Sequence, residues 1–168
     1  MHSLHLAILT AGALTLVFAA LHDVAARTIP NTASIVLALL GIATHVADGT
    51  ILFSLLIGAI VFTVSLFCWM RGWMGGGDVK LLAAAALFVA PGSVGSMIVA
   101  TSLFGGVLAV IYLIAREFAR RIALPTGPAP RNFIARVLRA EHWRLLRGAP
   151  LPYGSAIAAG TLFSLFPG

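Results

Sequence analysis

The sequence predicts an all-α membrane protein with six transmembrane helices and both termini outside the cytoplasm. Hydrophobic residues make up 60% of the 168-residue chain and charged residues only 10%, and the mean hydropathy is +1.03. Soluble domains carry about 25% charged residues, so a soluble globular protein is excluded, as are disordered and collagen-like chains. Long apolar runs and an uneven distribution of basic residues are the other two observations that support this fold class.

Three apolar segments occupy the first part of the chain, separated by turn-forming residues. Leu4–His22 is about as long as a full membrane span and has no lysine or arginine before it. We therefore interpret it as a retained helix and not as a secretory signal peptide. Pro30 suits the first turn of the next segment, Thr32–Val46. An Asp-Gly turn at 48–49 then leads into Ile51–Met70.

Three further segments follow, and the first of them is too short to cross a bilayer unaided. Val79–Ala90 has twelve residues, about 18 Å of helix against a hydrocarbon core of about 30 Å. We expect the preceding run, Gly72–Gly77, to be non-helical backbone at membrane depth, which is tolerated only where it is buried or lines a wet cavity. Local thinning of the bilayer is the alternative. Val94–Ala115 and Pro152–Phe166 complete the six segments.

The basic residues predict the orientation of these helices. Of the eleven lysines and arginines, eight arginines lie in the loop 116–150, while Arg27, Arg71 and Lys80 lie in or beside the first and third loops. All eleven fall on one predicted face, and the positive-inside rule makes that face cytoplasmic. The loop 116–150 carries the whole net charge of +6, since the other three basic residues balance the three aspartates of the chain.

This basic loop contains a candidate amphipathic helix. From Arg131 to Arg147, apolar residues recur at near-helical spacing among arginines, which favours a helix lying on the anionic inner leaflet. An ordinary basic cytoplasmic loop explains the composition equally well. Nucleic-acid binding is not expected, because the loop has few aromatic residues on which bases stack.

Asp23 and Asp78 are the candidate catalytic residues. Both lie at the predicted cytoplasmic end of an apolar segment, where acidic residues usually have a function. Two facing carboxylates in a low-dielectric cleft cannot both ionise cheaply. The ionised one can therefore take a proton from water while the neutral one polarises a carbonyl and protonates the leaving group, which hydrolyses a peptide without metal or covalent intermediate. Two structural roles stay open: Asp78 as a helix N-cap, and Asp23 paired with Arg27.

Three stretches of sequence add a family resemblance. Residues 75–78, GGGD, fit the GxGD motif of intramembrane aspartic proteases, and their continuation VKLL resembles the type IV prepilin peptidase family. The stretches DVAARTIPN at 23–31 and LPYG at 151–154 resemble the same family. In that family, the aspartate ahead of the R-x-I-P-N sequence and the GxGD aspartate form the catalytic pair. The resemblance therefore implies that Asp23 and Asp78 are catalytic.

The resemblance also implies a substrate and a cellular location. Members of the family remove the short basic leader of prepilin-like or pseudopilin proteins, after a glycine, at the cytoplasmic boundary of the inner membrane. Longer members add a cytoplasmic domain with paired cysteines that methylates the new N-terminus. Because the first segment begins at Leu4 and Cys68 is the only cysteine, the chain resembles the short, peptidase-only members of tight-adherence (Flp) pilus systems. We expect a single peptidase domain over residues 1–168, without a methyltransferase domain.

Six further residues are expected to bind substrate or support the loops of the site. They are Gly75, Gly77, Lys80, Arg27, Pro30 and Asn31. The two glycines give a substrate backbone room to approach, and Arg27 holds Asp23 ionised or positions the loop. Lys80 does not share a helix face with Asp78, and it orients the loop or meets lipid headgroups. No metal or cofactor is expected, and Cys68 is expected to be a packing residue.

Three other functions stay open. An archaeal-type preflagellin peptidase shares the chemistry but acts on a different substrate. A small transporter or proton-coupled carrier can use the same acids, although the two aspartate motifs show no inverted-repeat pairing. The third alternative is a non-catalytic assembly subunit of a secretion system, in which Asp78→Asn should leave the function unchanged.

Overall fold

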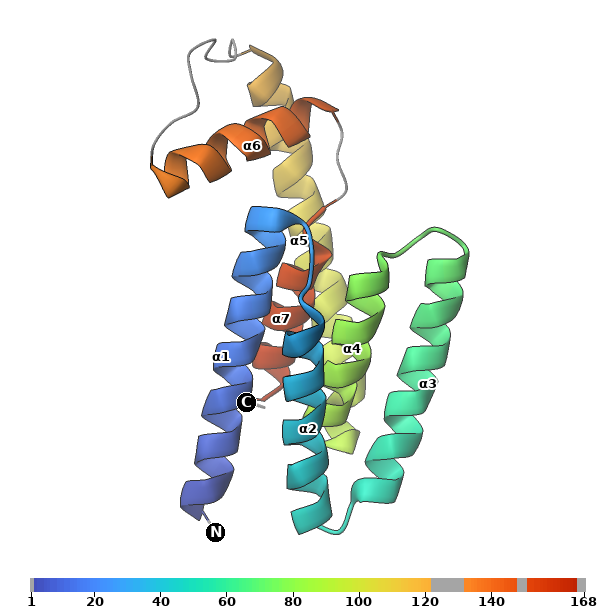
Figure 1. Ribbon diagram of the computed structural model, residues 1–168. Coiled ribbons are helices and arrows are strands. Elements are labelled where there is room, and N and C mark those ends of the chain that lie inside the picture. The colour runs from blue at the N-terminus through green and yellow to red at the C-terminus, as the bar shows by residue number, and fades with distance from the viewer. Residues whose placement is uncertain (1, 122–131, 148–150, 166–168) are drawn as a thin grey trace. The chain divides into compact units, whose positions relative to one another are not determined.

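A computed structural model describes residues 2–121, 132–147 and 151–165, and within these ranges it contains helices and no strands (Figure 1). The elements are α1 (His2–Ala26), α2 (Asn31–Ala47), α3 (Ile51–Met70), α4 (Gly76–Phe88), the short 3-10 helix η1 (Pro91–Ser93), α5 (Val94–Arg121), α6 (Phe133–Arg147) and α7 (Tyr153–Ser164). They form two compact units, residues 1–105 with 152–168 (unit 1) and residues 106–151 (unit 2).

The six predicted apolar segments all form helices in the described part of the chain. The prediction for α3 matches residue by residue, because a turn bounds the apolar run at each end. Helix α1 runs four residues beyond the predicted end at His22, so Asp23 lies inside the helix. The predicted amphipathic segment is helical over α6. Residues 122–131 and 148–150 of the predicted basic loop, and Phe166, lie outside the described residues.

Three local expectations were wrong. Gly76 and Gly77 are helical, because the Gly75 carbonyl accepts the Val79 N–H at 3.2 Å and starts the helix there. Gly75 is consequently the N-cap of α4, and Asp78 is the third helical residue and not the cap. Pro30 is the N-cap of α2 and does not lie in its first turn, since its carbonyl accepts the Ala33 N–H at 3.1 Å from outside the helix.

Three stretches of helix are long and apolar enough to cross a membrane: Ser3–Ala26, Ile51–Met70 and Pro91–Arg121. The outer faces of α1 and α3 expose large apolar side chains, such as Leu14 at 70% and Leu52 at 81%. These features describe a multi-pass membrane protein. Helices α2, α4 and α7 have 17, 13 and 12 residues, and six spans with both termini outside stay a prediction.

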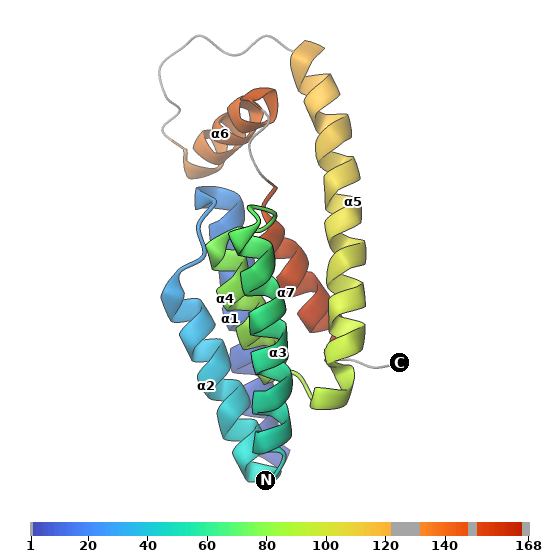
Figure 2. The same ribbon diagram turned by 90° about the vertical axis from the view of Figure 1, so that its right-hand side faces the viewer.

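Helix α4 is the centre of unit 1. It packs against α2, α3 and α7, while α1 packs against α2 and α7 (Figures 1 and 2). Its middle is the run Ala83–Ala86, and small side chains let neighbouring helices approach closely. The backbones of α2 and α4 approach closely at Gly41 of α2, where a Cβ atom would meet the backbone of Leu87 and Phe88.

Buried hydroxyl groups in unit 1 mostly bond to their own helix. Thr44, Ser54, Ser65 and Thr161 each donate to the carbonyl four residues earlier, at distances of 2.6 to 3.2 Å. This bond satisfies a buried hydroxyl without any partner on another helix. Ser34 of α2 and Thr101 of α5 differ: they are 7% and 4% exposed, and neither hydroxyl has a hydrogen-bond partner among the described residues.

In unit 2, α6 is joined to the second half of α5 by a polar contact. Glu141 accepts hydrogen bonds from the Tyr112 hydroxyl at 3.0 Å and from Arg144 at 2.6 Å. The guanidinium of Arg147 lies 3.7 Å from the ring centre of Trp143. The basic helix therefore has a fixed contact with α5 and keeps an aromatic side chain beside its arginines.

Gly41→Ala is expected to destabilise the protein by about 1–3 kcal/mol, because the added methyl group forces backbone apart in a packed interior. Thermal unfolding of the detergent-solubilised protein measures this effect. Gly95→Ala is the matched control, since a Cβ atom there meets no atom within 4 Å and alanine favours the helix. A melting temperature lowered equally by both substitutions contradicts the close α2–α4 contact.

Candidate active site

The first candidate residue, Asp23, lies near the C-terminal end of α1 and is 5% exposed. Its Oδ2 accepts a hydrogen bond from the Gly154 N–H at 2.8 Å, across a sequence separation of 131 residues. Gly154 is the second residue of α7, and the first N–H groups of a helix have no acceptor within it. The carboxylate thus satisfies a free donor and faces the positive end of the helix dipole.

The second candidate, Asp78, lies in the first turn of α4 and is partly buried. Its carboxylate accepts a hydrogen bond from the backbone of Gly75. A side chain at the third helical position that reaches back to the cap residue forms one half of a capping box. Asp78 is therefore not the N-cap that the sequence left open as an alternative. Its carboxylate instead binds the backbone of the N-cap residue Gly75 from a position within the helix.

The fold brings the two aspartates together. The C-terminal end of α1 and the N-terminal ends of α4 and α7 lie at the same end of unit 1 (Figure 1). The charge of Asp23 acts directly on the carboxyl group of Asp78. Two carboxylates 55 residues apart in sequence therefore share one site, in which each is held by a backbone N–H group.

Ile29 fills the space between the starts of α4 and α7. A Cβ atom at Gly77 would lie 3.3 Å from the Ile29 Cβ, and one at Gly154 would lie 2.9 Å from both the Ile29 Cδ1 and the Asp23 Oδ2. A Cβ atom at Gly75 would lie 2.9 Å from the Asp78 Oδ2. The missing side chains at Gly75 and Gly77 therefore serve packing within the protein, and room for a substrate at these glycines stays a prediction.

Sequence reasoning missed Gly154 and Ile29 as site residues. A signal for Gly154 existed, because it follows Pro152 at a helix start, where free N–H groups are expected. Ile29 is the isoleucine of the R-x-I-P-N sequence, but nothing local to that sequence indicates that its side chain packs between two helix starts. Its position between two glycines is set by the packing of three helices.

The loop after α1 turns sharply at Arg27. This residue has a φ of 56°, and its N–H donates to the Asp23 carbonyl at 2.8 Å, which is a left-handed helix ending. His22 binds the Thr28 carbonyl at 2.7 Å and closes the same loop. The backbone of Arg27 therefore positions the loop that carries Ile29. Whether its side chain also supports Asp23 stays a prediction.

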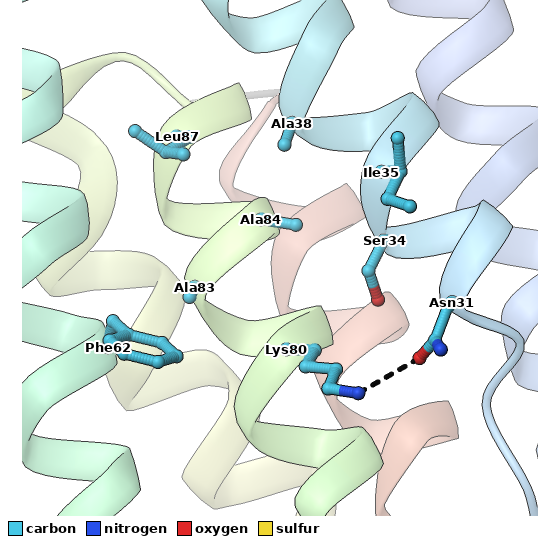
Figure 3. Close-up of a pocket in the computed structure, with 9 residues that line it drawn as sticks. All are labelled: Asn31, Ser34, Ile35, Ala38, Phe62, Lys80, Ala83, Ala84 and Leu87. Carbon is cyan, nitrogen blue, oxygen red and sulfur yellow. Dashed lines mark hydrogen bonds between the residues drawn. The ribbon is translucent and has the colours of Figure 1, made fainter.

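Lys80 and Asn31 meet on another side of α4. The Lys80 Nζ donates to the Asn31 Oδ1 at 3.1 Å and links α4 to the first residue of α2 (Figure 3). Residues two apart on a helix point about 200° apart, so Lys80 faces away from Asp78. The two predicted support residues contact each other and not the aspartate pair.

An apolar pocket of about 280 Å³ borders the site. Its lining includes Val64, Cys68, Met74, Leu82, Ile98 and Tyr153. Met74 precedes Gly75, and Tyr153 precedes Gly154, so the pocket adjoins the two backbone segments that bind the carboxylates. Among the described residues, no group of three or more histidine, cysteine or acidic side chains is placed to hold a metal ion.

Comparison with known proteins identifies the family. The sequence profile of the type IV leader peptidase family matches residues 10–110, a range that includes both aspartates, α1 from residue 10 onward, and all of α2, α3 and α4. The chain therefore belongs to the type IV leader peptidase family. No curated protein and no solved structure matches the chain.

Replacing Asp23 tests the bond to α7. Asp23→Ala leaves the buried Gly154 N–H without its acceptor and is expected to cost about 1–3 kcal/mol of stability. Asp23→Asn keeps an acceptor oxygen and removes the repulsion between the two carboxylates, so it should unfold at or above the wild-type temperature. Thermal unfolding of both variants in the same detergent measures the difference, and equal melting temperatures contradict a structural bond.

Proposed function

We propose that this leader peptidase is a membrane aspartic endopeptidase that cleaves prepilin-like proteins of the Flp type on the cytoplasmic side of the inner membrane. The meeting of Asp23 and Asp78 is the observation that carries the proposal, because one site then holds two acidic groups whose charges interact. Membership of the family supplies the substrate class, a type IV leader sequence. Methyl transfer is not part of the proposed activity.

In the proposed mechanism, one carboxyl group acts as the general base and the other as the general acid. The ionised one removes a proton from a water molecule, and the water oxygen adds to the carbon of the scissile carbonyl. The protonated one donates a hydrogen bond to the carbonyl oxygen as negative charge develops there, and then passes its proton to the departing amine. The C–N bond breaks, the leader leaves with a new carboxyl group, and one proton again lies on the pair. Either aspartate can take either part.

The surroundings of the pair suit this chemistry. Backbone N–H groups hold both carboxylates without neutralising them, and Gly154 and Ile29 leave little free space on the α7 side. The apolar pocket beside Met74 and Tyr153 supports binding of the apolar residues that follow a leader in its substrate. The substrate would then approach from the α3 side of α4, with its cleavage site at Asp78.

The proposal places six helices across the membrane with both termini outside. All three basic residues of unit 1, Arg27, Arg71 and Lys80, lie at the end where the aspartates meet, which supports a cytoplasmic site. In the sequence, the predicted cytoplasmic loop 116–150 holds the other eight arginines. Within this loop, α6 has the composition of a helix that rests on anionic lipid. The active site then lies where a leader leaves the cytoplasm.

Asp23→Asn and Asp78→Asn are each expected to lower cleavage of an Flp-type prepilin by about 100-fold or more, because either change removes one partner of the acid–base pair. Cleavage in liposomes, followed by gel electrophoresis, measures the rate. Asp48→Asn is the matched control: Asp48 is exposed in the α2–α3 turn, at the opposite end of unit 1, and its variant should cleave like wild type.

Full cleavage by either folded site variant would overturn the two-aspartate mechanism. Cleavage of preflagellin leaders alone would favour the archaeal-type peptidase. If no leader is cut and wild-type protein carries protons across liposomes, the carrier function is favoured. If Asp78→Asn supports pilus assembly in cells, the assembly-subunit function is favoured.

The cleavage rate is expected to have a maximum with pH. At low pH both carboxyl groups are protonated and no base remains, while at high pH both are ionised and no acid remains. A plot of kcat/KM for wild type between about pH 4 and 9 checks this dependence. A flat profile over that range speaks against a proton shared by the pair.

A further inference from the structure

A groove on the surface of unit 1 runs between α2 and α3, with α4 as its floor. Its volume is about 430 Å³, which lies in the usual range for ligand sites, about 300–1,000 Å³. The two flanking helices are joined by the short turn after α2 and diverge toward the end that carries Lys80 (Figure 1).

The two ends of the groove differ in chemistry. Away from Lys80, toward the predicted outer side, its lining is apolar, with Ala38 and Leu87 among the residues that form it (Figure 3). The opposite end has Asn31 and the exposed Lys80, the one charged side chain among the described residues of the lining. The ammonium group of Lys80 uses one donor on the Asn31 Oδ1 and has two further donors for a ligand.

Ser34 supplies an unused polar group between these ends. Its side chain lies in the groove with the hydroxyl directed toward the Lys80–Asn31 end (Figure 3). The hydroxyls of Thr44, Ser54, Ser65 and Thr161 donate to their own helix, whereas that of Ser34, like that of Thr101 in α5, has no partner among the described residues. Ser34 lies one helical turn below Asn31, about 4.5 Å farther from the Lys80 end.

We propose that this groove binds one anionic phospholipid of the inner leaflet. The phosphate contacts Lys80 and the Asn31 amide, the Ser34 hydroxyl donates to an ester carbonyl one turn deeper, and one acyl chain lies along the apolar floor. This order of charge, ester and hydrocarbon is that of a phospholipid at a membrane interface. A zwitterionic headgroup fits less well, because its cation is repelled by Lys80.

The position of the groove favours a lipid over a peptide. Lys80 points away from Asp78 on α4, so a peptide in the groove would present its backbone to the wrong side of that helix. The alanine floor leaves a channel with the volume of an ordinary small-ligand site. The lipid site needs no peptidase activity, but its place in the inner leaflet follows from the orientation proposed above.

Native mass spectrometry of the full chain in detergent, titrated with phosphatidylglycerol and with phosphatidylcholine, tests the site. Wild type is expected to retain one phosphatidylglycerol, and Lys80→Gln should weaken this binding about fivefold, the effect of one cation at a lipid surface. Arg71→Gln is the matched control, because Arg71 lies at the same end of unit 1 but not in the groove, and it should bind like wild type. Ala83→Phe fills the floor and should weaken binding of both lipids.

Three results would overturn the proposal. One is equal retention of phosphatidylglycerol by wild type and Lys80→Gln. Another is release of the bound lipid by millimolar inorganic phosphate, which would identify a simple anion site. The third is competition by the substrate: a leader peptide with its apolar helix displaces the lipid from wild type, and Ala83→Phe abolishes that displacement. The groove would then be a binding site for the substrate and not for a lipid. Folding of each variant is checked by its melting temperature.

Discussion

The hydrogen bond from the Gly154 N–H to the Asp23 carboxylate is the interaction on which the site depends. It ties the end of α1 to the start of α7, at the same end of unit 1 as the first turn of α4, which carries Asp78. An acidic group in an apolar interior is costly unless hydrogen bonds satisfy it. Helix N-termini offer such donors without using any side chain, and both aspartates of the candidate site bind backbone donors at such ends.

The short length of α4 explains why the polar side chain of Asp78 lies close to the apolar interior. With 13 residues, α4 is about 20 Å long, less than the hydrocarbon core of about 30 Å. In the proposed six-span arrangement, its N-terminus therefore lies below the level that a full-length span would reach, and Asp78 lies toward the interior of the membrane. The longer helices α2 and α3 pack against it, and small side chains along α4 let these neighbours approach closely.

Asp78 and Lys80 lie two residues apart on α4 but face different parts of the structure. Asp78 faces the partner aspartate and the start of α7, while Lys80 faces α2 and the groove beside it. The helical repeat separates them by more than half a turn. A reacting peptide and a bound lipid can therefore lie on opposite sides of α4, each with its own polar group.

The sequence by itself determined the helices, the membrane class and the two aspartates. Apolar runs bounded by glycine, proline and charge are local signals, which is why α3 is predicted residue by residue. The start of α4 was misplaced, because glycine is compatible with both helix and loop and only the hydrogen bond from Val79 to Gly75 decides between them. Tertiary structure alone decided that Gly154 and Ile29 complete the site and that Lys80 and Asn31 belong to a separate groove. These contacts join residues up to 131 positions apart, and no periodicity within a single helix specifies which of its neighbours packs against it.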